Sequence, residues 1–196
     1  MSFSCGKGLY GMGKITVHEF ISLDGVVENP RWTFEFGFDP KMGETIGALT
    51  GESKAILLGR NTFEMFQPAW STRTVDEDPG APFFNDTEKY VVASKSPGVE
   101  WANSTVIGPY DATTIEKLKA NVDGTIYVSG SARLVQGLLA DGLVDELHLF
   151  VYPIALGSGQ RLFADGVDQV KLGLVDSDVY SNGVVHLVYA PAAPSA

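Results

Sequence analysis

The stretch from Thr125 to Ala140 constrains the fold most, because its hydrophobic pattern changes partway along. Residues 125–129 are β-branched and aromatic, which is the composition of a buried strand. Beyond Gly130, leucine and valine recur at a spacing of three or four residues, which indicates a helix with one apolar face. The sequence therefore predicts a strand that meets the start of a helix through Gly130 and Ser131.

The junction at Gly130 and Ser131 would suit a phosphate group. The first N–H groups of a helix have no partners within the helix and carry the positive end of its dipole, so they attract anions. Glycine lets a phosphate approach the backbone closely, and serine adds a hydroxyl group. A tight turn without any ligand has the same composition, so the junction alone leaves both interpretations open.

The chain is long enough for one well-packed domain. It has 196 residues, of which 44% are hydrophobic, and its glycines and prolines lie between apolar runs. We expect residues 14–191 to form this domain. An extended or disordered leader over residues 1–13 would precede it, and a frayed tail over residues 192–196 would follow it.

Charge and cysteine content argue against several kinds of partner. The net charge of −10 disfavours a nucleic acid or an anionic membrane. Cys5 is the only cysteine, which excludes an intrachain disulfide and a cysteine metal cluster. His18, His148 and His186 fall in separate predicted strands, which favours sheet histidines over a metal site. With no signal peptide and no apolar run of about 20 residues, we expect a cytoplasmic protein that acts on a small molecule.

Short apolar runs alternate with helical patterns along the chain. The predicted strands cover residues 15–21, 55–58, 89–93, 104–107, 125–129, 146–152, 170–180 and 184–189. Predicted helices follow Asp39, Asn61, Thr113 and Ser131; Pro68 should end the second, and residues 71–86 should form a surface loop or lid. This order predicts an α/β protein with a mixed sheet, mostly parallel with a C-terminal antiparallel hairpin, and helices on both faces.

Three polar clusters follow predicted strands, at the edge of the sheet where ligands of such proteins bind. They are Gly59-Arg60-Asn61-Thr62, Ser94-Lys95-Ser96 and Gly130-Ser131-Ala132-Arg133. Each offers hydroxyl groups or a cation to a phosphate, and each alone also fits an ordinary turn. Together they favour a phosphorylated nucleotide as the ligand.

Several short motifs, in their order along the chain, resemble those of the dihydrofolate reductase-like superfamily. They are Ser22-Leu23-Asp24-Gly25, Leu58-Gly59-Arg60-Asn61-Thr62-Phe63, Gly130-Ser131, Leu143-Val144-Asp145-Glu146-Leu147, and Gly157-Ser158-Gly159 with Leu162-Phe163. The chain is most similar to stand-alone proteins that resemble the C-terminal reductase domain of the bifunctional riboflavin-biosynthesis deaminase-reductase. This resemblance implies a dihydrofolate reductase-like fold, NADPH as cofactor, and an activity similar to 5-amino-6-(5-phosphoribosylamino)uracil reductase or dihydrofolate reductase.

The same resemblance implies roles for individual residues. It places Arg60 beside the adenosine 2′-phosphate, where a guanidinium can make two parallel hydrogen bonds, and Thr62 at the pyrophosphate. It places Ser94 and Lys95 at the adenosine end and Val27 against the nicotinamide. The implied cofactor-binding set is Val27, Gly59, Arg60, Asn61, Thr62, Ser94, Lys95, Gly130, Ser131, Ala132, Arg133 and Leu134.

The substrate side differs from that of dihydrofolate reductases proper, which usually have Gly-Gly where this chain has Gly130-Ser131. Asp24 and Asp39 are candidate catalytic residues, and together with Trp32 they are candidates for substrate binding. Each has an alternative role: Asp24 fits an Asp-Gly turn, Asp39 fits a helix N-cap, and Trp32 fits the cover of a core.

The preferred function is an NADPH-dependent reductase of a small heterocyclic substrate. The alternatives are a non-catalytic module that binds a nucleotide or a pterin-like ligand, and a purely structural dimerisation domain. Apolar residues at the antiparallel end of the sheet need cover, and the resemblance implies pairing there, so we expect a homodimer.

Overall fold

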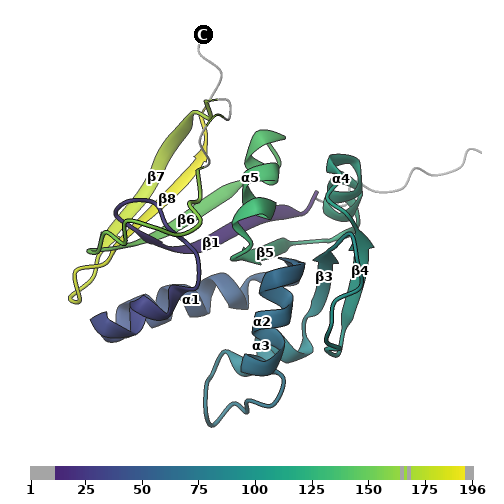
Figure 1. Ribbon diagram of the computed structural model, residues 1–196, viewed down its shortest axis with the longest axis horizontal. Helices are drawn as coiled ribbons and strands as arrows, with labels where there is room; N and C mark the ends of the chain where they lie inside the picture. The colour runs from purple at the N-terminus through teal and green to yellow at the C-terminus, as the bar shows by residue number, and fades with distance from the viewer. Residues whose placement is uncertain (1–11, 164–165, 167–168, 193–196) are drawn as a thin grey trace, which may run out of the picture.

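The computed structural model describes residues 12–163, 166 and 169–192, so most of the predicted leader and tail lies outside the described residues. The strands are β1 (Lys14–Ser22), β2 (Ser53–Gly59), β3 (Glu88–Val92), β4 (Ser104–Gly108), β5 (Thr125–Ser129), β6 (Glu146–Tyr152), β7 (Leu172–Val179) and β8 (Val185–Pro191). The helices are the 3-10 helix η1 (Pro30–Phe36) and the α-helices α1 (Pro40–Gly51), α2 (Arg60–Trp70), α3 (Ala81–Asp86), α4 (Ala112–Asn121) and α5 (Ala132–Ala140). Figure 1 shows their arrangement.

The strands form one sheet in the order β4-β3-β2-β5-β1-β6-β8-β7. Neighbours from β4 to β6 are parallel, whereas β8 pairs antiparallel with both β6 and β7. The last two strands are joined by the predicted turn at residues 181–183. The predicted fold class, a mostly parallel mixed sheet with a C-terminal antiparallel hairpin, is confirmed.

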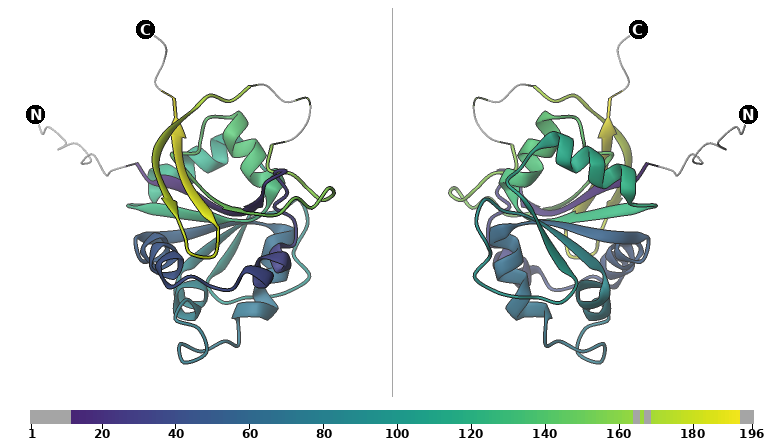
Figure 2. Two further views of the ribbon diagram at one scale, coloured as in Figure 1. Left: turned by 90° about the vertical axis from the view of Figure 1, so that its left-hand side faces the viewer. Right: turned by 90° about the vertical axis from the view of Figure 1, so that its right-hand side faces the viewer.

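Helices cover both faces of the sheet, as Figure 2 shows. On one face, α4 and α5 pack Ile115, Leu134 and Leu138 against alternate residues of the central strands. On the other face, Phe63 of α2 and Phe84 of α3 form a second core cluster, and Met42 of α1 forms a third. Side chains of a strand alternate between the two faces of a sheet, and helices cover both faces here. The central strands are therefore buried on both sides, which explains the continuous apolar run of β2.

The start of β1 is fixed by Asp145, which belongs to the Leu143–Leu147 motif. Its Oδ2 accepts hydrogen bonds from the backbone N–H of Ile15 at 2.7 Å and from Lys119 Nζ at 2.5 Å. The lysine is itself nearly buried, with 9% of its side chain exposed. Asp145 therefore holds the central strand β1 in register. It lies at the end of β1 opposite to the polar clusters.

The prediction that Pro68 ends a helix is wrong. The helix α2 continues through Pro68 to Trp70, and it begins at Arg60 rather than after an Asn61 cap. The proline breaks the hydrogen-bond pattern only near the end of the helix, and Trp70 there stacks on Phe84 with ring centroids 4.2 Å apart. Packing of Trp70 thus stabilises the last turn.

The polar segment over residues 71–86 also differs from the prediction of a loop or lid, because its last six residues form α3. Pro82 occupies the first turn, where its missing N–H costs nothing, and Phe84 is buried. The helix α4 is capped by Asp111, whose carboxylate accepts from Thr114, rather than by Thr113. Within the described residues, no helix combines the length and hydropathy needed to cross a membrane.

Candidate cofactor site

A cavity of about 800 Å³ lies at the carboxyl ends of the central strands. Its walls come from the end of β1, the junction of β2 with α2, the end of β3, and the junction of β5 with α5. The parallel arrangement of these strands brings their carboxyl ends to the same edge, which is where open α/β sheets bind ligands.

The starts of α2 and α5 meet at this edge through Ser131. The Ser131 Oγ accepts from the backbone N–H of Gly59 at 2.8 Å and donates to Thr62 Oγ1 at 2.6 Å. Neither helix has a side-chain N-cap, so the first N–H groups of both remain available at the cavity wall. Two positive helix ends therefore face one cavity.

Close packing between the two junctions explains the glycines. Gly130 and Ser131 are consecutive left-handed residues, each with φ of 68°. A Cβ added to Gly130 would lie 3.2 Å from the side chain of Thr62, and one added to Gly59 would lie 2.7 Å from Ser131 Oγ. Any larger residue at Gly59 or Gly130 would push the two helix starts apart or fill the space in front of them.

The predicted cofactor residues gather around this cavity. All of them line it except Lys95, which is exposed next to the lining residue Ser94. They come from separate segments of the chain, so the shared location is a property of the fold. Their contact with a cofactor stays a prediction.

Arg60 lies at the first position of α2 and is partly exposed. Its Nε donates to Glu64 Oε1 at 2.9 Å, and the same oxygen accepts from the backbone N–H of Gly98 at 2.8 Å. These two hydrogen bonds lower the pKa of the Glu64 carboxyl. The hydrogen bond from Gly98 has the larger effect. Glu64 thus orients the guanidinium of Arg60, which lines the cavity.

Val27 belongs to a loop that is paired with the Gly157–Leu162 motif. The N–H of Val27 donates to the carbonyl of Gln160 at 3.0 Å, and Leu162 N–H donates to the carbonyl of Gly25 at 2.9 Å. Gly159 has φ of 122°, and a Cβ there would lie 2.6 Å from a methyl group of Val26. The motif therefore supports the cavity wall from behind.

Asp24 anchors the same pair of segments. Its carboxylate accepts from Ser22 Oγ at 2.6 Å and from the backbone N–H groups of Leu156 and Gly157 at 3.0 and 2.7 Å. These hydrogen bonds, that of Ser22 first, lower the pKa of Asp24 to about 2. Asp24 is outside the cavity lining, and its contacts hold the turn after β1 against residues 156–157. Its role in catalysis or substrate binding stays a prediction.

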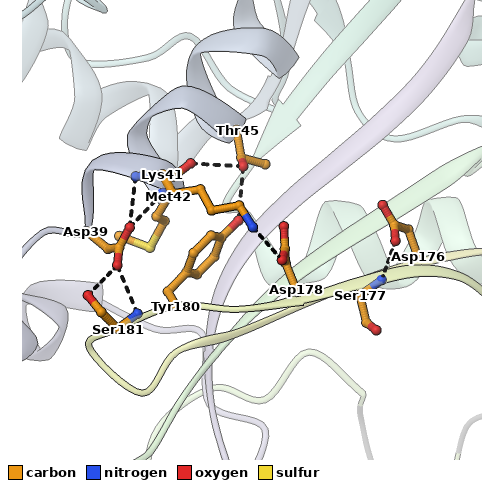
Figure 3. Close-up of polar contacts among 9 residues, drawn as sticks. All are labelled: Asp39, Lys41, Met42, Thr45, Asp176, Ser177, Asp178, Tyr180 and Ser181. Carbon is orange, nitrogen blue, oxygen red and sulfur yellow. Dashed lines mark hydrogen bonds and ion pairs between the residues drawn. The ribbon is translucent and has the colours of Figure 1, made fainter.

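Asp39 and Trp32 also lie outside the cavity lining. Asp39 caps α1 and accepts from both the N–H and the Oγ of Ser181 in the β7–β8 turn, at 2.9 and 2.5 Å (Figure 3). Hydrogen bonds from the Ser181 side chain and backbone lower its pKa. Trp32 packs edge-to-face on Tyr152, with ring centroids 5.4 Å apart. The structure does not bring these candidate substrate residues together with the cofactor set.

Glu19 lines the cavity and was not a predicted site residue. The residue is 3% exposed, and its Oε1 makes no hydrogen bond. Burial raises the pKa of its carboxyl to about 8, while hydrogen bonding with the Gly130 backbone acts in the opposite direction. In the sequence, Glu19 stands two residues from Val17 and two from Ile21 in a strand, so the three side chains share one face. Val17 and Ile21 are core residues, which makes an acidic residue between them unusual.

The three histidines fall in separate strands, as predicted, and they share one face of the sheet. His148 Nδ1 lies 3.0 Å from His186 Nε2, and His18 Nδ1 lies 2.6 Å from the hydroxyl of Tyr127. Burial lowers the pKa of His18 to about 3 and that of His186 to about 4, so both are neutral at pH 7. Among the described residues, no group of three or more acidic, histidine or cysteine side chains is placed to hold a metal.

The chain matches a known family over most of its length. The model of the RibD C-terminal domain matches residues 13–186. The uncharacterized protein YyaP of Bacillus subtilis (strain 168) is 28% identical over 173 residues, which cover 86% of this chain and 90% of YyaP.

Two solved structures show the same fold at low sequence identity. The diaminohydroxyphosphoribosylaminopyrimidine deaminase/5-amino-6-(5-phosphoribosylamino)uracil reductase of Thermotoga maritima is 15% identical with a TM-score of 0.66; the match covers 92% of this chain and 57% of that protein. Dihydrofolate reductase from Enterococcus faecalis, complexed with NADP(H) and RAB-propyl, is 16% identical with a TM-score of 0.60, and the match covers 93% and 99%.

Proposed function

Because this chain belongs to the RibD C-terminal domain family, we propose that it is an NADPH-dependent reductase of a small heterocyclic substrate. The observation that supports this proposal best is the cavity at which two uncapped helix starts and the predicted cofactor residues meet. The Enterococcus structure adds support, since a protein of this fold is complexed there with NADP(H).

The residues present fit a dinucleotide phosphate. Gly59 and Gly130 let the two helix starts pack closely against Ser131 and Thr62, and Thr62 and Arg133 line the cavity in front of them. The N–H groups of α2 and α5 would hold the pyrophosphate, and Arg60 would hold the 2′-phosphate. When bound, a reduced nicotinamide supplies a hydride, and the chain orients the reactants and excludes water.

Apolar side chains give the remaining part of the cavity a different character. Phe20, Met65 and Phe66 line it together with Val27. Such side chains suit a flat ring more than a charged or strongly hydrated group. This composition supports a heterocyclic substrate.

Binding and turnover measured side by side test the proposal. NADPH binding should quench the fluorescence of Trp32, Trp70 or Trp101, and absorbance should report oxidation of NADPH when 5-amino-6-(5-phosphoribosylamino)uracil or dihydrofolate is added. Failure to bind NADPH would refute the proposal. Tight binding without oxidation by either acceptor would favour the non-catalytic binding module.

We also propose that the chain forms a homodimer through its antiparallel end. The edge strand β7 exposes Leu174, Val175 and Val179, with 57%, 65% and 71% of each residue accessible. Apolar side chains on an edge strand, which has a neighbour on one side only, favour pairing with another copy.

Light scattering should therefore give about twice the chain mass of 21.0 kDa at micromolar concentration. Val175→Lys should shift the protein towards monomer because it places a charge in the proposed interface. The matched control is Val106→Lys, since Val106 is 46% exposed on β4 at the opposite edge of the sheet. A wild-type mass near that of one chain would contradict the dimer.

A further inference from the structure

Glu19 occupies a position at which only a hydrogen bond with the Gly130 backbone compensates for a charge. It lies on β1, the strand between β5 and β6, and its neighbours Val17 and Ile21 on the same face are core residues. Register pairs His18 with Ser129, so Glu19 lies beside Gly130 at the end of β5. No salt bridge involves Glu19 among the described residues, and its Oε1 has no hydrogen-bond partner.

Ionising a buried carboxyl that has no cationic partner and one oxygen without a hydrogen bond is costly, so such a group keeps its proton at neutral pH. A protonated carboxyl has an O–H group to donate, and Glu19 lines the cavity proposed for the cofactor and substrate. The fold therefore places a neutral, almost fully buried acid at the wall of the site.

The other acidic groups near this site already form hydrogen bonds with other residues. The carboxylates of Asp24 and Asp39 each accept several hydrogen bonds and lie outside the cavity lining. Glu28 lines the cavity but is exposed, and it accepts from the backbone N–H of Gln160 at 3.1 Å. Tyr110 lines it as well, but its hydroxyl donates to Asp141 at 2.7 Å.

We propose that Glu19 is the proton donor of this site and contacts the heteroatom of the substrate double bond that is reduced. This proposal rests on the proposed function, with a reduced nicotinamide supplying the hydride to the carbon of a C=N or C=O bond. The O–H bond of Glu19 breaks, and an N–H or O–H bond forms on the heteroatom that receives the electron pair of the double bond. Water then returns a proton to the carboxylate.

The proton donor acts only while Glu19 is protonated. Because its folded-state pKa is raised to about 8, the acid is present below pH 8 and is lost as the pH rises through that value. The titratable and charged groups that line the same cavity as Glu19 are Glu28, Arg60, Tyr110 and Arg133. On the opposite face of the sheet lie Tyr127 of β5 and His18 of β1.

Infrared spectroscopy combined with single-turnover kinetics tests this role. Wild type should show the C=O band of a protonated carboxyl at pH 7, with a midpoint of disappearance near the pKa of about 8. Glu19→Gln should lack the band, and Glu44→Gln, at an exposed position of α1, should retain it. The band should move when NADPH and either 5-amino-6-(5-phosphoribosylamino)uracil or dihydrofolate fill the cavity, because the O–H group gains an acceptor.

Glu19→Gln should bind NADPH with unchanged affinity but oxidise it at least about 100-fold more slowly, as for the loss of a general acid. The fall in wild-type rate between pH 7 and 9 should be absent from the variant. Glu19→Asp, which keeps the acid on a shorter side chain, should recover part of the rate, and it replaces Glu19→Gln as the test if that variant unfolds.

The outcomes separate the two proposals. If wild type binds and oxidises NADPH while Glu19→Gln keeps the wild-type rate and pH profile, Glu19 is not the proton donor and the reductase assignment stands. Absence of a protonated carboxyl band at pH 7 would likewise exclude Glu19 as the donor and leave the reductase assignment intact. If wild type fails to bind NADPH, the proposed function is refuted and the role of Glu19 with it.

Discussion

Gly130→Val should abolish NADPH binding. A valine Cβ at this position would lie 3.2 Å from Thr62, so its two methyl groups would crowd the junction of α2 and α5 that lines the cavity. The backbone there has φ of 68°, which a β-branched residue adopts only with strain, so the variant should also melt at a lower temperature. Fluorescence titration of the folded fraction measures the affinity, and thermal unfolding measures the stability.

Gly142→Val is the matched control because it separates strain from steric exclusion. Gly142 follows the other end of α5, has φ of 65°, and has no atom within 4 Å of an added Cβ. This variant should lose comparable stability, about 1–2 kcal/mol for a left-handed residue other than glycine, and bind NADPH like wild type. A Gly130→Val protein that stays folded and binds NADPH normally would remove the β5–α5 junction from the site.

Local patterns carried enough information to predict the elements around this junction. The bounds of β5 and β6 were predicted to the residue, because strand composition there gives way abruptly to glycine, serine or proline. The gathering of the polar clusters also followed from the sequence. Once the strands are parallel, their carboxyl ends share an edge, and residues as distant as Gly59 and Ser131 come into contact.

What the sequence did not reveal depends on contacts between distant residues. The turn prediction for Asp24 gave no sign of its hydrogen bonds to Leu156 and Gly157, which lie 132 and 133 residues away. The extension of α2 past Pro68 depends on the stacking of Trp70 on α3. Propensity rules treat each segment by itself, so tertiary packing overrode them at these positions.

Glu19 illustrates a different reason for a missed residue. Its strand was predicted, but a single acidic residue in a strand is compatible with a solvent-facing position. Only the sheet order shows that β1 is central and covered on both faces, which turns the same glutamate into a buried group. Burial thus identifies this candidate, whereas the predicted cofactor residues came from polar clusters that follow strands and from the family resemblance.

Arg60→Ala should weaken NADPH binding by at least about 1.5 kcal/mol, which is roughly a tenfold rise in Kd, and leave NADH binding nearly unchanged. The reason is that only NADPH carries the 2′-phosphate. Within the described part of the chain, the guanidinium of Arg60 donates to Glu64 through Nε, and its Nη groups make no hydrogen bond and stay available for a phosphate. Fluorescence titration with both cofactors measures the difference.

Two further variants distinguish a phosphate contact from a general effect of charge. Arg73→Ala removes the same charge beyond the far end of α2, where Arg73 lies over Trp70 and pairs with Asp78, so it should bind both cofactors like wild type. Arg60→Lys keeps the charge but loses the planar fork, so its NADPH affinity should fall between those of wild type and Arg60→Ala. If the wild-type protein bound NADPH and NADH with equal affinity, the 2′-phosphate would contribute nothing to binding. This result would contradict the role of Arg60.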